Sequence, residues 1–115
     1  MRFRTTIGQV AVVGGRRYDR VEGILVDERT SLFARGRGQS NLYVLVEMEG
    51  QVGGREVVAE RLANIVRDTY FKQRRSVTAG LQQAVRAANS FLLEENRNSL
   101  PDEQRTAGVS CAVLR

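Results

Sequence analysis

Apolar and β-branched residues occur in short runs through the first half of the chain, a pattern typical of strands. Residues 2–13 alternate polar and apolar side chains and end at two glycines, which predicts a strand followed by a turn. Residues 21–27 and 31–34 predict two shorter strands joined by a polar connection. Residues 42–46 form a continuous apolar run of strand length, and we expect that strand to be buried on both faces.

The spacing of apolar residues becomes helical in the second half of the chain. A first helix is predicted from Glu56 to residue 72 or 73, and a second from the N-cap residue Ser76 to residue 95 or 96. The apolar positions that recur at helical spacing are Val58, Leu62, Ile65 or Val66, and Tyr70 in the first helix, and Leu81, Ala84, Val85, Ala88, Phe91 and Leu92 in the second.

Residues 96–102 contain helix-breaking asparagines and a proline, and residues 108–114 predict a final strand. The order is therefore strands, two helices and one strand. This order predicts an α+β fold, with a largely antiparallel sheet and two antiparallel helices on one face. Neither an internal repeat nor a linker divides the sequence, so we expect residues 1–115 to form a single domain.

Composition is that of a small globular domain, with 115 residues, 42% of them hydrophobic and 27% charged. No apolar run approaches the roughly 18 residues of a membrane span, and the basic N-terminus is not followed by an apolar segment, so a cytoplasmic location is expected. The sequence has no histidine, which excludes Ser-His and Cys-His catalysis within this chain. Its one cysteine, Cys111, lies in an apolar run and is predicted to be a buried structural thiol.

The net charge of +5 raises the question of a nucleic-acid partner. Basic residues are spread along the chain, and Lys72 is the only lysine. The denser arginine groups lack the interleaved aromatic residues on which bases stack. Nucleic-acid binding is therefore not favoured, whereas a phosphate-bearing partner stays open.

Residues 42–59 combine an apolar strand, a glycine-rich turn and the start of a helix. This segment resembles the metal-dependent protein phosphatase 2C family, in which a strand ends in Asp-Gly-Met-Gly-Gly-His and is followed by Gly-Glu and a helix. Aligned without a gap, Glu47 takes the place of the metal-binding Asp, Met48 that of the first Gly and Val52 that of the His, while Glu56 matches the Glu that opens the helix.

The resemblance extends through the second helix and the last strand. Residues 81–89, Leu-Gln-Gln-Ala-Val-Arg-Ala-Ala-Asn, mirror the family's helix pattern, and Gly108-Val-Ser110 takes the place of its Gly-Thr-Thr. The resemblance implies that residues 1–115 form a partial phosphatase 2C-like domain, similar to half of the family's four-layer sandwich.

Candidate site residues follow from the same resemblance. Glu22, Glu47 and Glu49 would be the metal ligands, and Arg16 and Arg17 the phosphate-binding residues. The alternative for the glutamates is solvated carboxylates at a strand end. For the arginines it is a solvent-facing or salt-bridged turn.

The family's chemistry requires two Mg²⁺ or Mn²⁺ ions bridged by carboxylates. Glutamate at position 47 shifts the carboxylate by about one bond length, which octahedral Mg²⁺ sites tolerate poorly. Valine at position 52 removes the candidate general acid. The family's further Asp ligands would lie beyond Arg115. We therefore expect no cofactor in this chain, and Mg²⁺ or Mn²⁺ if any activity is retained.

Three functions are consistent with these observations. The favoured one is a catalytically inactive phosphatase-like domain that serves as a binding or regulatory module, with a phosphoprotein as a possible ligand. The second is the first half of an active metal-dependent serine/threonine phosphatase. The third is a basic module that docks nucleic acid or phosphorylated protein through loops around Arg17 and Arg35. Because the strands offer more apolar surface than two helices cover, we also expect a homo-oligomer or pairing with a second half-domain, burying at least roughly 1,000 Å².

Overall fold

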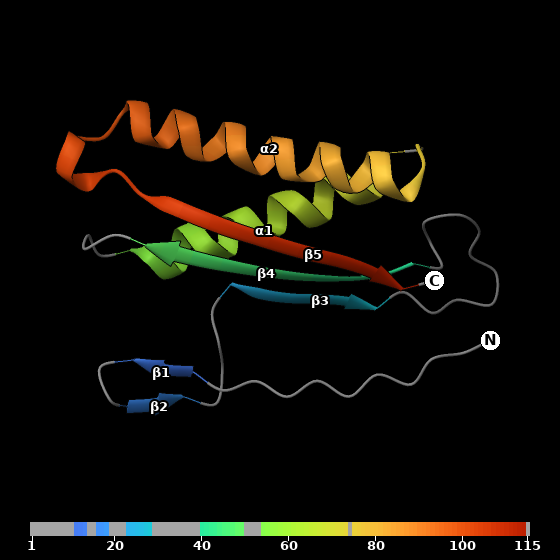
Figure 1. Cartoon of the computed structure of the whole chain (residues 1–115), viewed down its shortest axis with the longest axis horizontal. Coiled ribbons are helices and arrows are strands. Elements are labelled where there is room, and N and C mark those ends of the chain that lie inside the picture. The colour runs from blue at the N-terminus through green and yellow to red at the C-terminus, as the bar shows by residue number, and fades with distance from the viewer. Residues whose placement is uncertain are drawn as a thin grey trace.

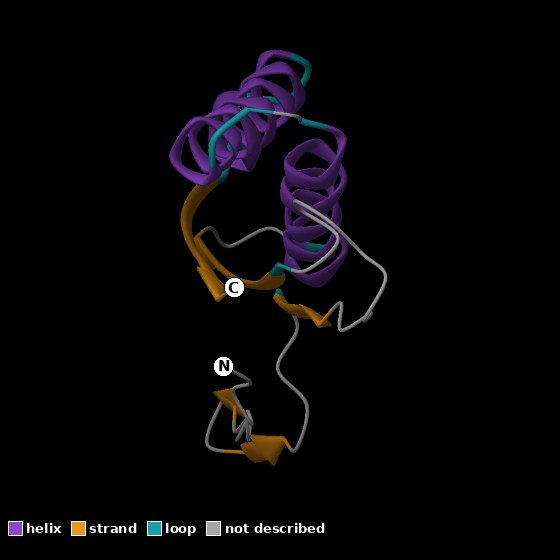
Figure 2. Ribbon diagram, turned by 90° about the vertical axis from the view of Figure 1, so that its right-hand side faces the viewer, coloured by secondary structure: helices purple, strands orange, loops and turns teal. Residues whose placement is uncertain are grey.

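The computed structural model describes residues 11–13, 16–18, 23–28, 40–49, 54–73 and 75–114. In chain order its elements are β1 (Ala11–Val13), β2 (Arg16–Tyr18), β3 (Ile24–Glu28), β4 (Asn41–Glu49), α1 (Arg55–Lys72), α2 (Val77–Arg97), the short 3₁₀ helix η2 (Pro101–Glu103) and β5 (Thr106–Leu114). Strands β3, β4 and β5 form an antiparallel sheet in that order. The two long helices run antiparallel on one face of this sheet (Figures 1 and 2). The predicted α+β fold, with two helices on one face of an antiparallel sheet, is confirmed.

The central strand, β4, determines which side chains face the helices. Leu42, Val44 and Val46 alternate along the strand and are at most 4% exposed. Tyr43 and Leu45 point to the other face, and Leu45 is 36% exposed. The prediction that this strand is buried on both faces is wrong, because both described helices pack on the same face and none covers the other.

Helix α1 begins after Gly54, which adopts a left-handed backbone conformation with a φ of +82°. This conformation suits glycine, which has no Cβ to clash with the backbone. Glu56 in the first turn and Lys72 in the last turn both complement the helix macrodipole. The helix ends at Lys72, as predicted, because Gln73 returns to an extended conformation.

Helix α2 begins after Ser76, as the sequence predicts. The Ser76 hydroxyl accepts a hydrogen bond from the backbone N–H of Ala79 at 3.2 Å and so satisfies one of the free donors of the first turn. The helix ends at Arg97, slightly later than predicted. Of its predicted apolar positions, Ala84 and Ala88 are fully buried, whereas Val85 is exposed.

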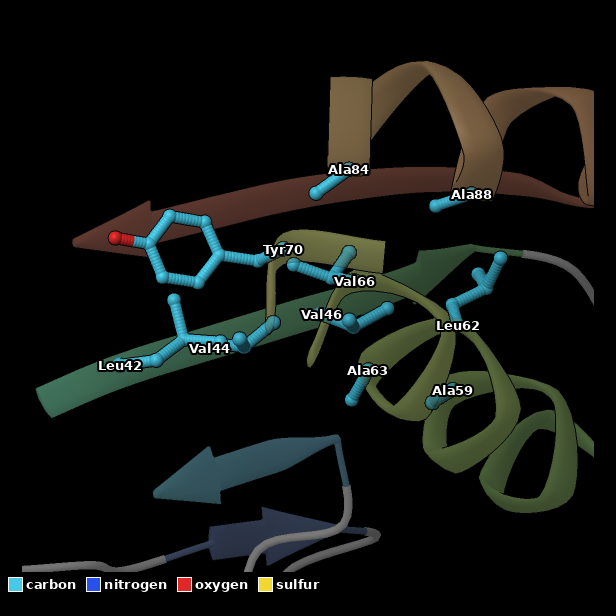
Figure 3. Close-up of a cluster of buried hydrophobic side chains, with 10 residues drawn as sticks. All are labelled: Leu42, Val44, Val46, Ala59, Leu62, Ala63, Val66, Tyr70, Ala84 and Ala88. Carbon is cyan, nitrogen blue, oxygen red and sulfur yellow. The ribbon is translucent and has the colours of Figure 1, made fainter. Parts of the chain in front are cut away.

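Helix α1 contributes the larger share of the core (Figure 3). Leu62, Val66 and Tyr70 are buried as predicted. Two small residues that the pattern did not single out are buried as well, Ala59 and Ala63. Alanines let a helix approach its neighbours closely, so a small side chain can occupy a core position without a strong apolar signal in the sequence. The ten buried residues of this core are Leu42, Val44, Val46, Ala59, Leu62, Ala63, Val66, Tyr70, Ala84 and Ala88.

Several strand boundaries differ from the predicted ones. Strand β4 continues to Glu49 and β5 begins at Thr106, so both are longer than expected. Of the strand predicted at residues 2–13, the structure describes only β1, which pairs with β2 in a separate two-stranded sheet. The strand predicted at residues 31–34 lies outside the described residues.

Gly23 fixes the start of β3 against β4. Its carbonyl accepts a hydrogen bond from the backbone N–H of Val46 at 2.8 Å, and its φ is +83°. A Cβ at this position would lie 2.6 Å from the Val46 carbonyl oxygen and 3.3 Å from the Cβ of Ala59. Only glycine fits here, because both the positive φ and the close approach of β4 and α1 exclude a side chain.

Candidate functional site

The candidate site lies at the corner of the domain where β4 ends and β5 begins. Glu47 lies opposite Gly108 and Glu49 lies opposite Thr106 in the antiparallel pair. Both glutamates are exposed, and both point to the sheet face away from the helices. Their Cα atoms are about 7 Å apart, since two residues of a strand span this distance.

Met48 lies between the two glutamates and points to the opposite face. It is half-buried and packs against the hydrophobic core. No described residue other than glycine has a positive φ, so Met48 adopts ordinary strand geometry. The segment that would carry the metal ligand in a phosphatase 2C-like site is therefore regular strand as far as Glu49, and methionine costs no backbone strain at position 48.

Arg105 lies at the same corner, next to the start of α1. A Cβ placed on Gly54 would be 3.6 Å from Nη2 of the Arg105 guanidinium. The arginine side chain is half-buried. A guanidinium beside a helix N-terminus adds to the positive potential of the helix dipole, and both would oppose a divalent cation bound there.

The backbone of Arg105 is held by Asn96 at the end of α2. The Asn96 Oδ1 accepts a hydrogen bond from the Arg105 N–H, and its Nδ2 donates one to the Arg105 carbonyl, each at 2.8 Å. The sequence patterns did not indicate Arg105 as a residue of this corner. Asn96 and Arg105 are nine positions apart, and no motif in the sequence links them.

The sequence-predicted metal ligands are brought together only in part. Glu47 and Glu49 share one face of β4, whereas Glu22 lies outside the described residues. Within the described ranges, no three His, Cys, Asp or Glu side chains are grouped closely enough to hold a metal ion. A hard divalent ion takes six or more oxygen ligands, so two exposed carboxylates on a strand make at most a weak site.

The predicted phosphate-binding residues, Arg16 and Arg17, begin strand β2. They pair with Val13 and Val12 of β1, and not with the three-stranded sheet that carries the glutamates. The alternative placed these arginines in a turn, whereas both are strand residues.

Cys111 points from β5 toward the helices and packs at the margin of the core. It is half-buried, and desolvation raises the pKa of its thiol above the ordinary value. A raised pKa keeps the group in the neutral form, which is a poor nucleophile. The thiol thus has a structural setting, although it is less buried than predicted.

Neither α1 nor α2 is long and apolar enough to cross a membrane. No protein-family model matches the sequence, and no curated protein or solved structure is detectably similar to it.

Proposed function

We propose that this chain is a catalytically inactive phosphatase-like domain that acts as a binding or regulatory module. The observation that carries the proposal is the geometry of residues 47–49, which continue a regular strand with both carboxylates exposed and Met48 packed against the core. An active site of this class needs converging carboxylates that hold two ions at once. The absence of histidine from the whole chain points the same way, since the usual general acid is missing.

The order of elements supports the phosphatase-like part of the proposal. A strand, a glycine that opens a helix, two antiparallel helices and a returning strand occur in the sequence order of the resemblance. The strand that carries Glu47 lies beside the strand that carries Gly108-Val-Ser110, so the two segments that carry the resemblance are neighbours in the sheet.

A phosphorylated protein is the partner that we propose for this module. The positive charge of Arg105 beside the start of α1 is more compatible with an anionic ligand than with a metal ion. We place the module in the cytoplasm, where a lone thiol such as Cys111 stays reduced.

Hydrolysis of p-nitrophenyl phosphate in the presence of Mn²⁺ tests the loss of catalysis. We expect the same rate for the wild-type protein, for Glu47→Ala and for a reaction without protein. The matched control is Glu95→Ala, which removes an exposed carboxylate on α2 and leaves both glutamates of β4 in place. Turnover that disappears in Glu47→Ala and persists in Glu95→Ala would instead identify an active metal-dependent phosphatase.

We also propose that the chain self-associates. The sheet face away from the helices carries exposed apolar side chains on all three strands, among them Val26, Leu45 and Leu114. Exposed apolar surface of this kind marks interaction sites. Size-exclusion chromatography with light scattering should give a mass of at least twice the chain mass of 12.9 kDa. A monomer at micromolar concentration contradicts this part of the proposal.

A further inference from the structure

Strand β5 forms one border of the three-stranded sheet, and in the described part of the chain it is paired on one side only. Its nine residues pair with β4 without interruption, from Thr106 opposite Glu49 to Leu114 opposite Asn41. Figure 1 shows β5 in red along this border. The strand therefore has a second edge, whose backbone groups point away from the sheet.

One hydrogen bond identifies the residues that form this second edge. The N–H of Val46 bonds to the carbonyl of Gly23, on the β3 side of β4. The N–H and C=O groups of successive strand residues point to opposite sides, so those of Leu45 point toward β5, where Leu45 lies opposite Ser110. The N–H and C=O groups of Ser110 therefore point toward β4. The residues that direct their N–H and C=O groups outward are Ala107, Val109, Cys111 and Val113.

The composition of β5 leaves this edge unprotected. Natural sheets protect long edges with charged side chains, with proline or with a bulge. The sequence Thr-Ala-Gly-Val-Ser-Cys-Ala-Val-Leu contains neither charge nor proline, although 27% of the whole chain is charged. The unbroken register with β4 leaves no bulge. Such an edge is suited to accept another strand.

Helix α2 covers this border incompletely. The residues of β5 that face the helices are only half-buried, whereas the corresponding residues of β4 are buried. Strand β5 is therefore less covered by the helices than β4 is.

We infer that β5 pairs antiparallel with the β5 of a second copy of this chain, about a two-fold axis at Ser110. The two three-stranded sheets then become one continuous sheet. Ser110 is the middle residue of Thr106–Leu114, so a pair centred there uses the whole strand. In this register the outward backbone N–H and C=O groups of Val109 lie opposite those of Cys111 in the second copy, and each such pair of residues exchanges two hydrogen bonds. The inference rests on the self-association proposed above and assigns the first contact to the β5 edge, beside the apolar sheet face.

A second copy fits this edge because a two-fold axis brings each central residue close to its own counterpart. A charge near the axis would face a like charge, and β5 has none. On the face away from the helices, Gly108, Ser110 and Ala112 are small and hinder no neighbour. A partner of different sequence would be recognised through complementary charges along the edge, and β5 has no charged residue to provide them.

Replacing Ser110 with arginine tests this interface in solution. Light scattering should give a dimer for the wild-type protein and a monomer for Ser110→Arg at the same concentration, because the variant places two guanidinium groups at the axis. The matched control is Ser90→Arg on α2, where the serine is also exposed, and this variant should remain a dimer. Circular dichroism establishes that each variant keeps its helix content.

Cross-linking at the axis gives a second, independent result. Ser110 pairs with its counterpart at a position without backbone hydrogen bonds, where Cα atoms are about 4.5 Å apart, within the range of a disulfide. Ser110→Cys in a Cys111→Ala background should form a covalent dimer on mild oxidation, and Ser90→Cys in the same background should not. A dimer that survives Ser110→Arg and does not cross-link overturns this interface but leaves self-association standing. A monomeric wild-type protein overturns both, and neither result depends on phosphatase turnover.

Discussion

The side chain of Asn96 and the backbone of Arg105 form a reciprocal pair of hydrogen bonds, both 2.8 Å long. The amide group thereby satisfies both backbone groups of the residue that precedes β5. The same asparagine lies near the end of α2, so the pair ties the helix to the strand across the intervening η2 turn. It also fixes Arg105 beside the start of α1, at the candidate corner.

Asn96→Ala should lower the free energy of unfolding by about 1–3 kcal/mol, because it leaves a part-buried backbone donor and acceptor without these partners. Chemical denaturation measures the change. Asn89→Ala, at an exposed position within α2, is the matched control and should be neutral or slightly stabilising. Equal losses in the two variants would show that the reciprocal pair contributes little.

Gly23→Ala should destabilise the domain by at least about 2 kcal/mol. Alanine would have to adopt a φ of +83° and place its Cβ 2.6 Å from the Val46 carbonyl oxygen. Gly108→Ala is the contrasting variant, because a Cβ there meets nothing within 4 Å. Thermal unfolding should show a large decrease in Tm for the first variant and none for the second. A stable Gly23→Ala protein would contradict the close approach of β3 to β4.

Ser76→Ala should cost about 1 kcal/mol of stability, because the first turn of α2 loses the acceptor for the Ala79 N–H. Ser90→Ala removes a hydroxyl from the exposed middle of the same helix and should be neutral or stabilising, since alanine has the higher helix propensity. Urea midpoints of the two variants, compared at equal m-values, measure the difference. A harmless Ser76→Ala would mean that the cap is dispensable.

Burial raises the pKa of the Cys111 thiol, so at about pH 8 the folded protein should contain less thiolate than the unfolded chain. Reaction with Ellman's reagent should therefore be slower in the native state than in denaturant. The stability that the neutral thiol contributes is present below the unfolded pKa and is lost as the pH rises through the folded pKa. A native rate equal to that of the denatured protein would show that the thiol is not protected.

The helices were the most predictable part of the fold. Their apolar spacing, the Ser76 cap and the breaker before β5 are local signals, and the structure follows each of them. The burial of β4 was predicted wrongly because a run such as Leu-Tyr-Val-Leu-Val does not indicate how many of its faces will be covered. That property depends on where the helices pack, which is a tertiary contact.

The candidate corner was predictable only as far as the resemblance led to Glu47 and Glu49. Their exposure depends on the pairing of β4 with β5, which brings together residues about 60 positions apart in the chain. Arg105 reaches the corner through the same pairing and through Asn96, and neither relation leaves a motif in the sequence.

We propose that this domain resembles a phosphatase that has lost its metal site, and calorimetric titration of Mn²⁺ tests that loss without depending on a substrate. We expect only heats of dilution across millimolar concentrations, for the wild-type protein and for Glu47→Ala alike. Two exposed carboxylates on one strand do not supply the ligand set that a divalent ion requires. Saturable binding in the wild-type protein that Glu47→Ala abolishes and Glu95→Ala leaves unchanged would contradict the claim.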